Sequence, residues 1–144
     1  MAELQNVKPW LVKKEERYLI SSQTVTIWGR LLTLPVLYDC YAGESVTPEQ
    51  INAIKHLFSH VDWIEKAKKQ VELYCRESVD EDDENQKKDN IFSYVKLESI
   101  FVKRDKDYPR IALMCKYRYD PEHGLAVVFT KDGEITVGSQ DIIL

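Results

Sequence analysis

The richest concentration of reactive side chains in this sequence is a five-residue segment, Asp120-Pro121-Glu122-His123-Gly124, between two apolar runs. It combines carboxylates with an imidazole, and these groups transfer protons in acid–base catalysis. Glu122 and His123 are therefore a candidate acid–base pair, with Asp120 as a helper. However, adjacent residues of an extended chain point to opposite sides, and no serine or cysteine is visibly tied to the pair. We therefore assign no catalytic residue.

The same segment has the composition of a tight turn. Pro121 fixes its own backbone torsion, Asp120 can accept hydrogen bonds from following amides, and Gly124 can adopt a positive φ. We expect a stable chain reversal. We predict that this turn has a structural or partner-binding role and not a catalytic one. Its signature residues are Asp120, Glu122, His123 and Gly124.

Two histidines four residues apart, His56 and His60, lie on a segment with helical periodicity. This spacing stacks the two side chains on one face of a helix, and such pairs can bind zinc. Leu57 stands where the metalloprotease motif has its glutamate, and no third ligand is obvious. We expect no metal site and no other cofactor.

A helical projection groups these histidines with Trp63 and Tyr74 on a second face of the helix. If that face is exposed, His56, His60, Trp63 and Tyr74 form a possible interface, because large aromatic side chains often anchor protein contacts. Alternatively, the N-terminal segment around residues 10–12 covers it. A homodimer in which Trp63 and Tyr74 meet a second copy of the chain also stays open.

Hydrophobic periodicity predicts the elements that carry these residues. Alternating apolar residues predict a hairpin from Thr24 to Tyr41, reversed at Gly29-Arg30. Thr47-Pro48-Glu49-Gln50 predicts a capped helix start, and apolar residues at three- and four-residue steps continue that helix to about Glu77. Four further strands are predicted at 94–103, 111–119, 125–130 and 135–138, the last two joined by an Asp-Gly turn.

Together these elements predict an α+β fold, in which an antiparallel sheet of a hairpin and a four-stranded meander carries one long helix on one face. The chain of 144 residues suits a single domain, 1–144. Residues 1–17 are expected to form an N-terminal arm. Residues 80–90 have no apolar side chain to bury and are expected to form a mobile acidic loop; their spacing does not match a calcium-binding loop.

Composition limits the classes of function. The 20 basic and 24 acidic side chains are mixed along the chain and give a net charge of -4, so no nucleic-acid footprint stands out. No run approaches the roughly 20 apolar residues that span a bilayer, and no signal peptide is evident. We expect no membrane association and a cytoplasmic location. Cys40, Cys75 and Cys115 are expected to be reduced and buried.

A wider pattern resembles a group of small bacterial domains of unknown function. The matching residues span most of 24–138 and include Trp28-Gly29, Asp39-Cys40-Tyr41, Gly43-Glu44, Thr47-Pro48-Glu49-Gln50, Asp120-Pro121-Glu122-His123-Gly124-Leu125 and Val137-Gly138. In that group an aromatic-rich strand ends in a D-x-E-H-G turn. Some related families are predicted immunity proteins against polymorphic toxins, so the resemblance implies a toxin-like protein partner and brings no catalytic residue.

Two classes of function follow. The first is a non-catalytic protein-binding module, with the immunity-protein-like role that the resemblance implies. The second is a small hydrolase-type enzyme that uses Glu122 and His123 as acid and base. A homodimeric structural scaffold is a further alternative, and the oligomeric state is not fixed by the sequence.

Overall fold

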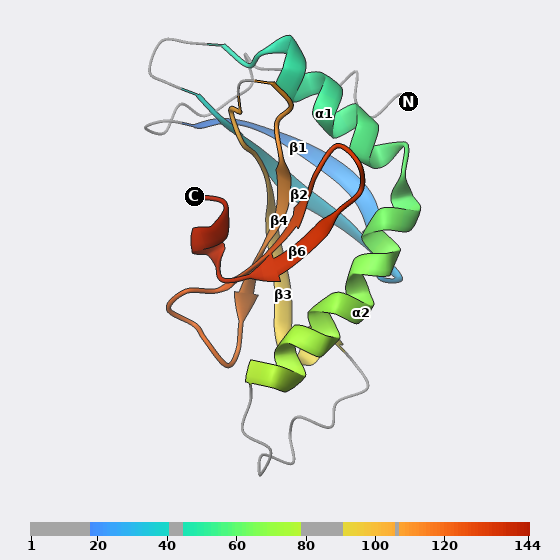
Figure 1. Cartoon of the computed structure of the whole chain (residues 1–144), viewed down its shortest axis with the longest axis vertical. Helices are drawn as coiled ribbons and strands as arrows, with labels where there is room; N and C mark the ends of the chain where they lie inside the picture. Colours follow the sequence, from blue (N-terminus) through green and yellow to red (C-terminus); the bar gives the residue numbers. More distant parts are fainter. Residues whose placement is uncertain (1–17, 41–44, 79–90, 106) are drawn as a thin grey trace.

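The computed structural model describes residues 18–40, 45–78, 91–105 and 107–144 (Figure 1). The predicted N-terminal arm and the predicted acidic loop lie outside these residues. The elements in chain order are β1 (Tyr18–Ile27), β2 (Arg30–Asp39), α1 (Pro48–Phe58), α2 (Val61–Ser78), the 3-10 helix η4 (Ile91–Ser93), β3 (Val95–Val102), β4 (Ile111–Tyr117), β5 (Leu125–Phe129), β6 (Ile135–Gly138) and the 3-10 helix η5 (Gln140–Ile142).

The strands form one mixed sheet of six strands, in the order β1-β2-β3-β4-β5-β6. The strands β2 and β3 pair in parallel, whereas the other neighbouring pairs are antiparallel. The predicted fold class, an antiparallel sheet with a single long helix, is therefore wrong. A crossover between β2 and β3 makes these two strands parallel, and α1 and α2 lie within that crossover. Hydrophobic alternation reports which face of a strand is buried, but it does not report strand direction.

The predicted long helix is two helices. The helix α1 begins as expected, because Thr47 and Gln50 form both hydrogen bonds of a capping box. It ends at Phe58, where the Ser59 hydroxyl and the His60 Nδ1 both donate to the His56 carbonyl, over 2.7 Å and 2.8 Å. These side chains occupy the acceptor that the next helical turn would use. The His60 amide bonds instead to Leu57, over 2.9 Å, and α2 starts at Val61.

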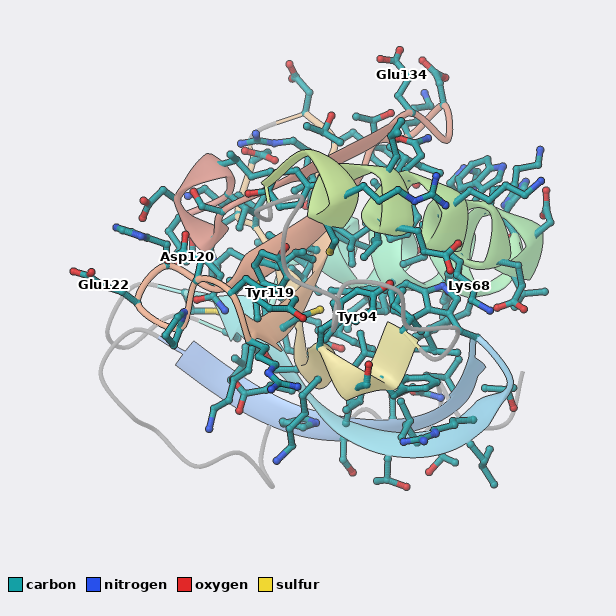
Figure 2. All side chains as sticks on the ribbon, turned by 90° about the horizontal axis from the view of Figure 1, so that it is seen from below. Lys68, Tyr94, Tyr119, Asp120, Glu122 and Glu134 are labelled. Carbon is teal, nitrogen blue, oxygen red and sulfur yellow. The ribbon has the colours of Figure 1, made fainter. Side chains whose placement is uncertain are left out.

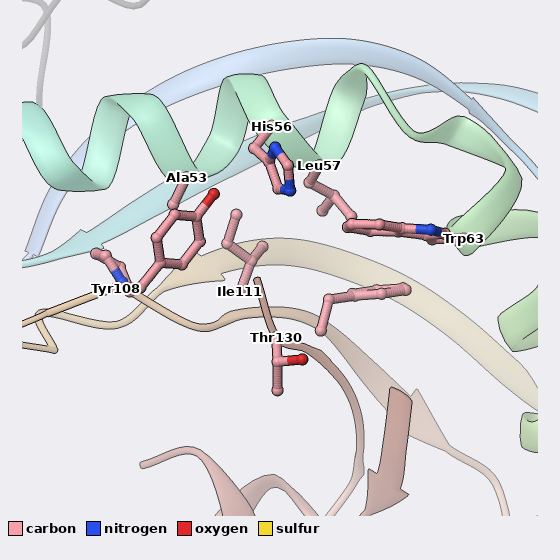
Figure 3. A pocket seen from close by; sticks show the side chains of 9 residues that line it. Ala53, His56, Leu57, Trp63, Tyr108, Ile111 and Thr130 are labelled. Carbon is pink, nitrogen blue, oxygen red and sulfur yellow. The ribbon is translucent and has the colours of Figure 1, made fainter. Parts of the chain in front are cut away.

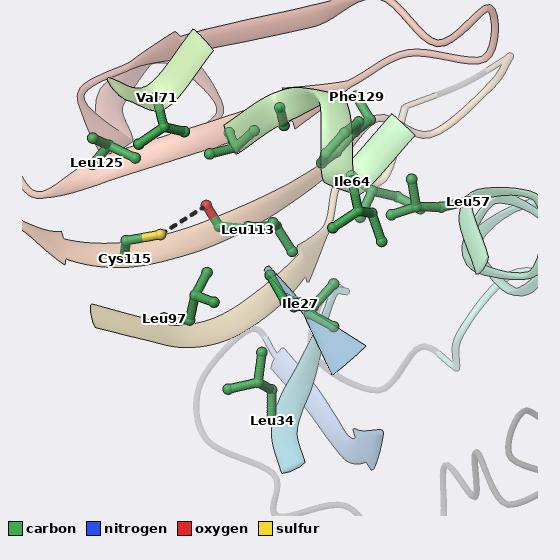
Figure 4. Packing of buried hydrophobic residues seen from close by; sticks show 14 of the residues in the cluster. Ile27, Leu34, Leu57, Ile64, Val71, Leu97, Leu113, Cys115, Leu125 and Phe129 are labelled. Carbon is green, nitrogen blue, oxygen red and sulfur yellow. Dashed lines mark hydrogen bonds between the residues drawn. The ribbon is translucent and has the colours of Figure 1, made fainter. Parts of the chain in front are cut away.

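The main core lies between the two helices and one face of the sheet (Figure 4). Helix residues and strand residues interleave there, and each fully buried aliphatic side chain contributes about 1.5–3 kcal/mol to folding. The residues include Ile54, Leu57, Ile64 and Val71 from the helices and Val36, Ile100, Leu113, Leu125 and Phe129 from the strands. A smaller cluster on the opposite face contains Phe101, Met114, Val128 and Ile143. Both faces of the central strands are therefore packed.

Gln50 ties the first helix to the parallel strand pair. Its side chain is fully buried, and its Nε2 donates to the carbonyls of Asp39 and Val102, over 3.0 Å and 3.2 Å. These carbonyls lie at the ends of β2 and β3. This buried amide satisfies both strand-end carbonyls and joins the start of α1 to β2 and β3.

The three cysteines are buried and none forms a disulfide, as predicted. Burial raises the pKa of Cys75 to about 11 and also raises that of Cys115, so both are neutral thiols near pH 7. Over the described ranges, no helix is both long enough and apolar enough to cross a bilayer.

Candidate functional site

The predicted signature residues Asp120 to Gly124 connect β4 to β5. The Asp120 carbonyl accepts the Gly124 amide over 2.9 Å, which closes the turn. The Asp120 Oδ1 accepts the His123 amide over 3.3 Å and lies 3.0 Å from the His123 Nδ1. The imidazole therefore pairs with Asp120, three residues earlier, and not with the adjacent Glu122.

This pair is exposed and electrostatically coupled. The side chains of His123 and Asp120 retain 50% and 38% of their accessible surface. The hydrogen bond that His123 donates to Asp120, together with the charge of that carboxylate, raises the pKa of His123 above the ordinary value of 6.5. The turn therefore presents an imidazole that is protonated over a wider pH range, flanked by carboxylates. Figure 2 shows Asp120 and Glu122 together at one end of the molecule, next to Tyr119.

The backbone of the turn is held from beneath by the C-terminal 3-10 helix η5. The Gln140 amide donates to the His123 carbonyl over 3.1 Å, and its Nε2 donates to the Cys115 carbonyl over 3.0 Å. Gly124 has φ +65, and a Cβ there would lie 2.7 Å from the Gln140 Nε2. A side chain at Gly124 would therefore displace Gln140 from beneath the turn. Sequence reasoning missed Gln140, because its contacts join segments whose pairing the sequence does not display.

Tyr74 lies at the same end of the molecule as this turn. Its ring centroid is 6.2 Å from that of Tyr117, which in turn is 5.7 Å from Tyr119. Burial and then the charge of Asp120 raise the pKa of Tyr74. The helical projection had grouped Tyr74 with Trp63, but the structure places it with the tyrosines beside Asp120.

His56, His60 and Trp63 form a separate aromatic cluster at the α1–α2 junction. Figure 3 shows His56 and Trp63 of this cluster. The His60 and Trp63 rings stack with centroids 4.1 Å apart. The His56 Nε2 donates to the Lys131 carbonyl over 3.0 Å, because a carbonyl can only accept. A Cβ at Gly133 would lie 2.6 Å from the Trp63 ring. The β5–β6 turn therefore packs against the cluster that was predicted to be an interface or to lie under the N-terminal arm.

The cavity beside this cluster is too small for an organic substrate. It is lined by Ala53, His56, Leu57, Trp63, Tyr108 and Thr130, among others, and encloses about 10 Å³, roughly the space of one water molecule. In the described ranges, no three histidine, cysteine or acidic side chains are grouped so that they could hold a metal ion. His56 and His60 act through packing and backbone hydrogen bonds.

Comparison with known proteins matches residues 10–144 to a domain of unknown function, DUF6985. The chain belongs to this family. The match covers both the β4–β5 turn and the α1–α2 junction, and the family description carries no activity. No curated protein and no solved structure matches the chain.

Proposed function

We propose that this protein is a non-catalytic protein-binding module, and that the β4–β5 turn contributes to its contact surface. The observation that carries this proposal is that Asp120 and His123 are exposed and yet held in place. Their mutual hydrogen bond fixes the imidazole, while Gln140 fixes the backbone beneath it. A recognition surface that is ordered before binding loses less entropy when the partner arrives.

The surroundings of the turn favour recognition over proton transfer. The cavity beside the α1–α2 junction is not lined by residues of the turn. Cys75 and Cys115 are buried, and burial raises the pKa of both thiols, so they are neutral near pH 7. An acid–base pair needs a substrate held within hydrogen-bond reach and shielded from water. Asp120 and His123 lie on an exposed turn, where a partner surface reaches them directly.

The resemblance to small bacterial domains suggests what kind of protein the partner is. Some relatives of that group are predicted immunity proteins, so the partner proposed here is a toxin-like protein made by the same cell. The protein is proposed to act inside that cell. The homodimer alternative is weaker, since Trp63 packs on Gly133 of its own chain.

The test begins with the tagged full-length protein as bait in a lysate of its source cells. A stoichiometric partner is identified, purified and titrated against the parent protein, Glu122→Gln and His123→Ala. Glu134→Gln is the matched control, because Glu134 is an exposed glutamate on the β5–β6 turn, away from Glu122 (Figure 2). We expect His123→Ala to weaken binding about tenfold, which corresponds to about 1.4 kcal/mol, while the control changes affinity less than about twofold.

The same variants test the enzyme alternative. The parent, Glu122→Gln and His123→Ala are assayed against a broad panel of hydrolase substrates. A turnover in the parent that falls by orders of magnitude in either variant would overturn the binding-module proposal. Equal backgrounds in all three proteins, together with a partner whose affinity depends on His123, would support it.

A further inference from the structure

A second surface lies where η4 meets the start of β3 and the end of β4. It is a groove of about 250 Å³ lined by Phe92, Ser93, Tyr94, Val95, Lys96, Lys116 and Arg118. Lys96 alternates with Val95 and Leu97, which are buried in the main core beneath the helices. Side chains alternate between the faces of a strand, so Lys96 points to the face of the sheet opposite the helices.

The groove concentrates positive charge on an acidic protein. Lys96 and Lys116 are direct partners in the β3–β4 register, and like charges in that position destabilise a sheet. Arg118 follows Lys116 on the same face of the chain and is exposed. Outside the lining residues, the guanidinium of Arg30 lies 4.0 Å from the centre of the Phe92 ring, which lines the groove.

One carboxylate offsets part of this charge. Glu98 lies 3.5 Å from the Lys116 Nζ. Across the described part of the chain, neither Lys96 nor Arg118 forms an ion pair. The Arg118 Cζ lies 5.9 Å from the centre of the Tyr119 ring. The folded protein thus keeps an unfavourable pair of facing lysines together with an exposed guanidinium. A bound anion would relieve that repulsion.

We propose that this groove binds an acidic segment of a partner protein. Lysine and arginine side chains donate charge-assisted hydrogen bonds to carboxylates, and Phe92 and Tyr94 supply an apolar wall for the aliphatic parts of such a segment. The volume suits a few side chains and is below that of typical cofactor sites. That the partner is a protein rests on the function proposed above, but the groove is a separate surface from the β4–β5 turn.

A nucleic acid fits this groove less well. Long polyanions need a basic footprint that extends along the backbone, whereas this protein carries a net charge of -4. Asp120 follows Arg118 by two residues, and Glu122 lies just beyond it, so carboxylates bound the patch on that side. A short run of carboxylates can engage Lys96, Lys116 and Arg118 without meeting those acidic residues.

The test uses the full-length protein and a labelled peptide of about eight residues that alternates glutamate with alanine. Binding is followed by fluorescence anisotropy. The matched probe replaces each glutamate by glutamine, while inorganic phosphate and a short single-stranded DNA serve as competing anions. The decisive variant is Lys96→Glu with Arg118→Glu. Its control is Lys55→Glu with Lys69→Glu, which makes the same change in net charge at exposed positions on α1 and α2.

We expect the acidic peptide to bind the parent, the glutamine peptide to bind at least about tenfold more weakly, and affinity to fall as salt rises from about 50 to about 200 mM. The groove variant should lose about tenfold in affinity and the control less than about threefold. Absence of binding to the parent, equal losses in the two double variants, or stronger competition by phosphate or DNA than by unlabelled peptide would each overturn the proposal.

The partner found with the tagged bait separates this proposal from the one above. If the groove variant still captures that partner with parental affinity while His123→Ala does not, the groove proposal fails and the binding module stands. If both variants keep parental affinity, both surfaces are excluded. If the groove variant alone loses affinity, the groove is the contact and the turn is not.

Discussion

Two regions of the molecule place histidines at the connection between two elements, and they use them in opposite ways. At the α1–α2 junction, His56 and Trp63 reach across to the β5–β6 turn through the Lys131 carbonyl and Gly133. In the β4–β5 turn, His123 bonds to Asp120 within the turn itself and keeps half of its side-chain surface.

This difference separates stability from recognition. Side chains that contact another element contribute to the folded state, so replacing them should change the free energy of unfolding. Side chains that bond only within an exposed turn contribute little to that free energy and stay accessible to a partner.

The largest effect is expected for Gly133→Ala. Gly133 has φ +82, a region that costs other residues roughly 1–2 kcal/mol, and the added Cβ would overlap the Trp63 ring. We expect a loss of about 3 kcal/mol in urea unfolding. Gly29→Ala is the matched control, because Gly29 has φ +87 with nothing within 4 Å of its added Cβ, so it carries the strain alone. Equal losses in the two variants would show that Trp63 does not pack tightly on the β5–β6 turn.

A smaller effect is expected for Trp63→Ala. The ring stacks on His60 and covers Gly133, but it is only partly buried, so the loss should be about 2 kcal/mol, below that of a fully buried aromatic. Leu73→Ala on the same helix is the control, since Leu73 is 54% exposed and should change stability by less than about 0.5 kcal/mol. If Trp63→Ala leaves the free energy of unfolding unchanged, Trp63 does not stabilise the α1–α2 junction, and the cluster there is an exposed surface.

The smallest effect concerns the charge of His123. Its pKa in the folded protein is raised by Asp120, so its contribution to stability is present below the unfolded value near 6.5 and is lost as the pH rises through the folded value. An NMR titration of the imidazole should give a pKa above 6.5 that falls in Asp120→Asn. If the pKa of His123 is the same in the parent protein and in Asp120→Asn, Asp120 does not pair with His123 in solution.

Local features of the fold could be predicted because their causes lie within a few residues. The Thr47–Gln50 capping box and the tight turn at Gly133 both follow from short-range chemistry. The break between α1 and α2 was missed, because the apolar spacing continues through it while Ser59 and His60 compete for one carbonyl. The parallel pairing of β2 and β3 was also missed, since it depends on where a crossover returns the chain.

The candidate sites divide in the same way. The residues of the β4–β5 turn were found from composition, whereas the hydrogen bond between His123 and Asp120 became visible only in the structure. The grouping of Trp63 with Tyr74 assumed one uninterrupted helix, and the structure separates them. The basic groove was not anticipated at all, because Lys96 and Lys116 are distant in sequence and become neighbours only through the register of β3 and β4.

By itself the sequence determined where the first helix begins and which segment makes the acidic turn with its histidine, since these depend on local hydrogen bonding. Only the tertiary structure decided the direction of the strands, the cover over Trp63, the Gln140 support beneath the turn and the facing lysines of the groove. Each of these depends on contacts between segments far apart in the chain, and their geometry is set by packing the whole sheet against its helices.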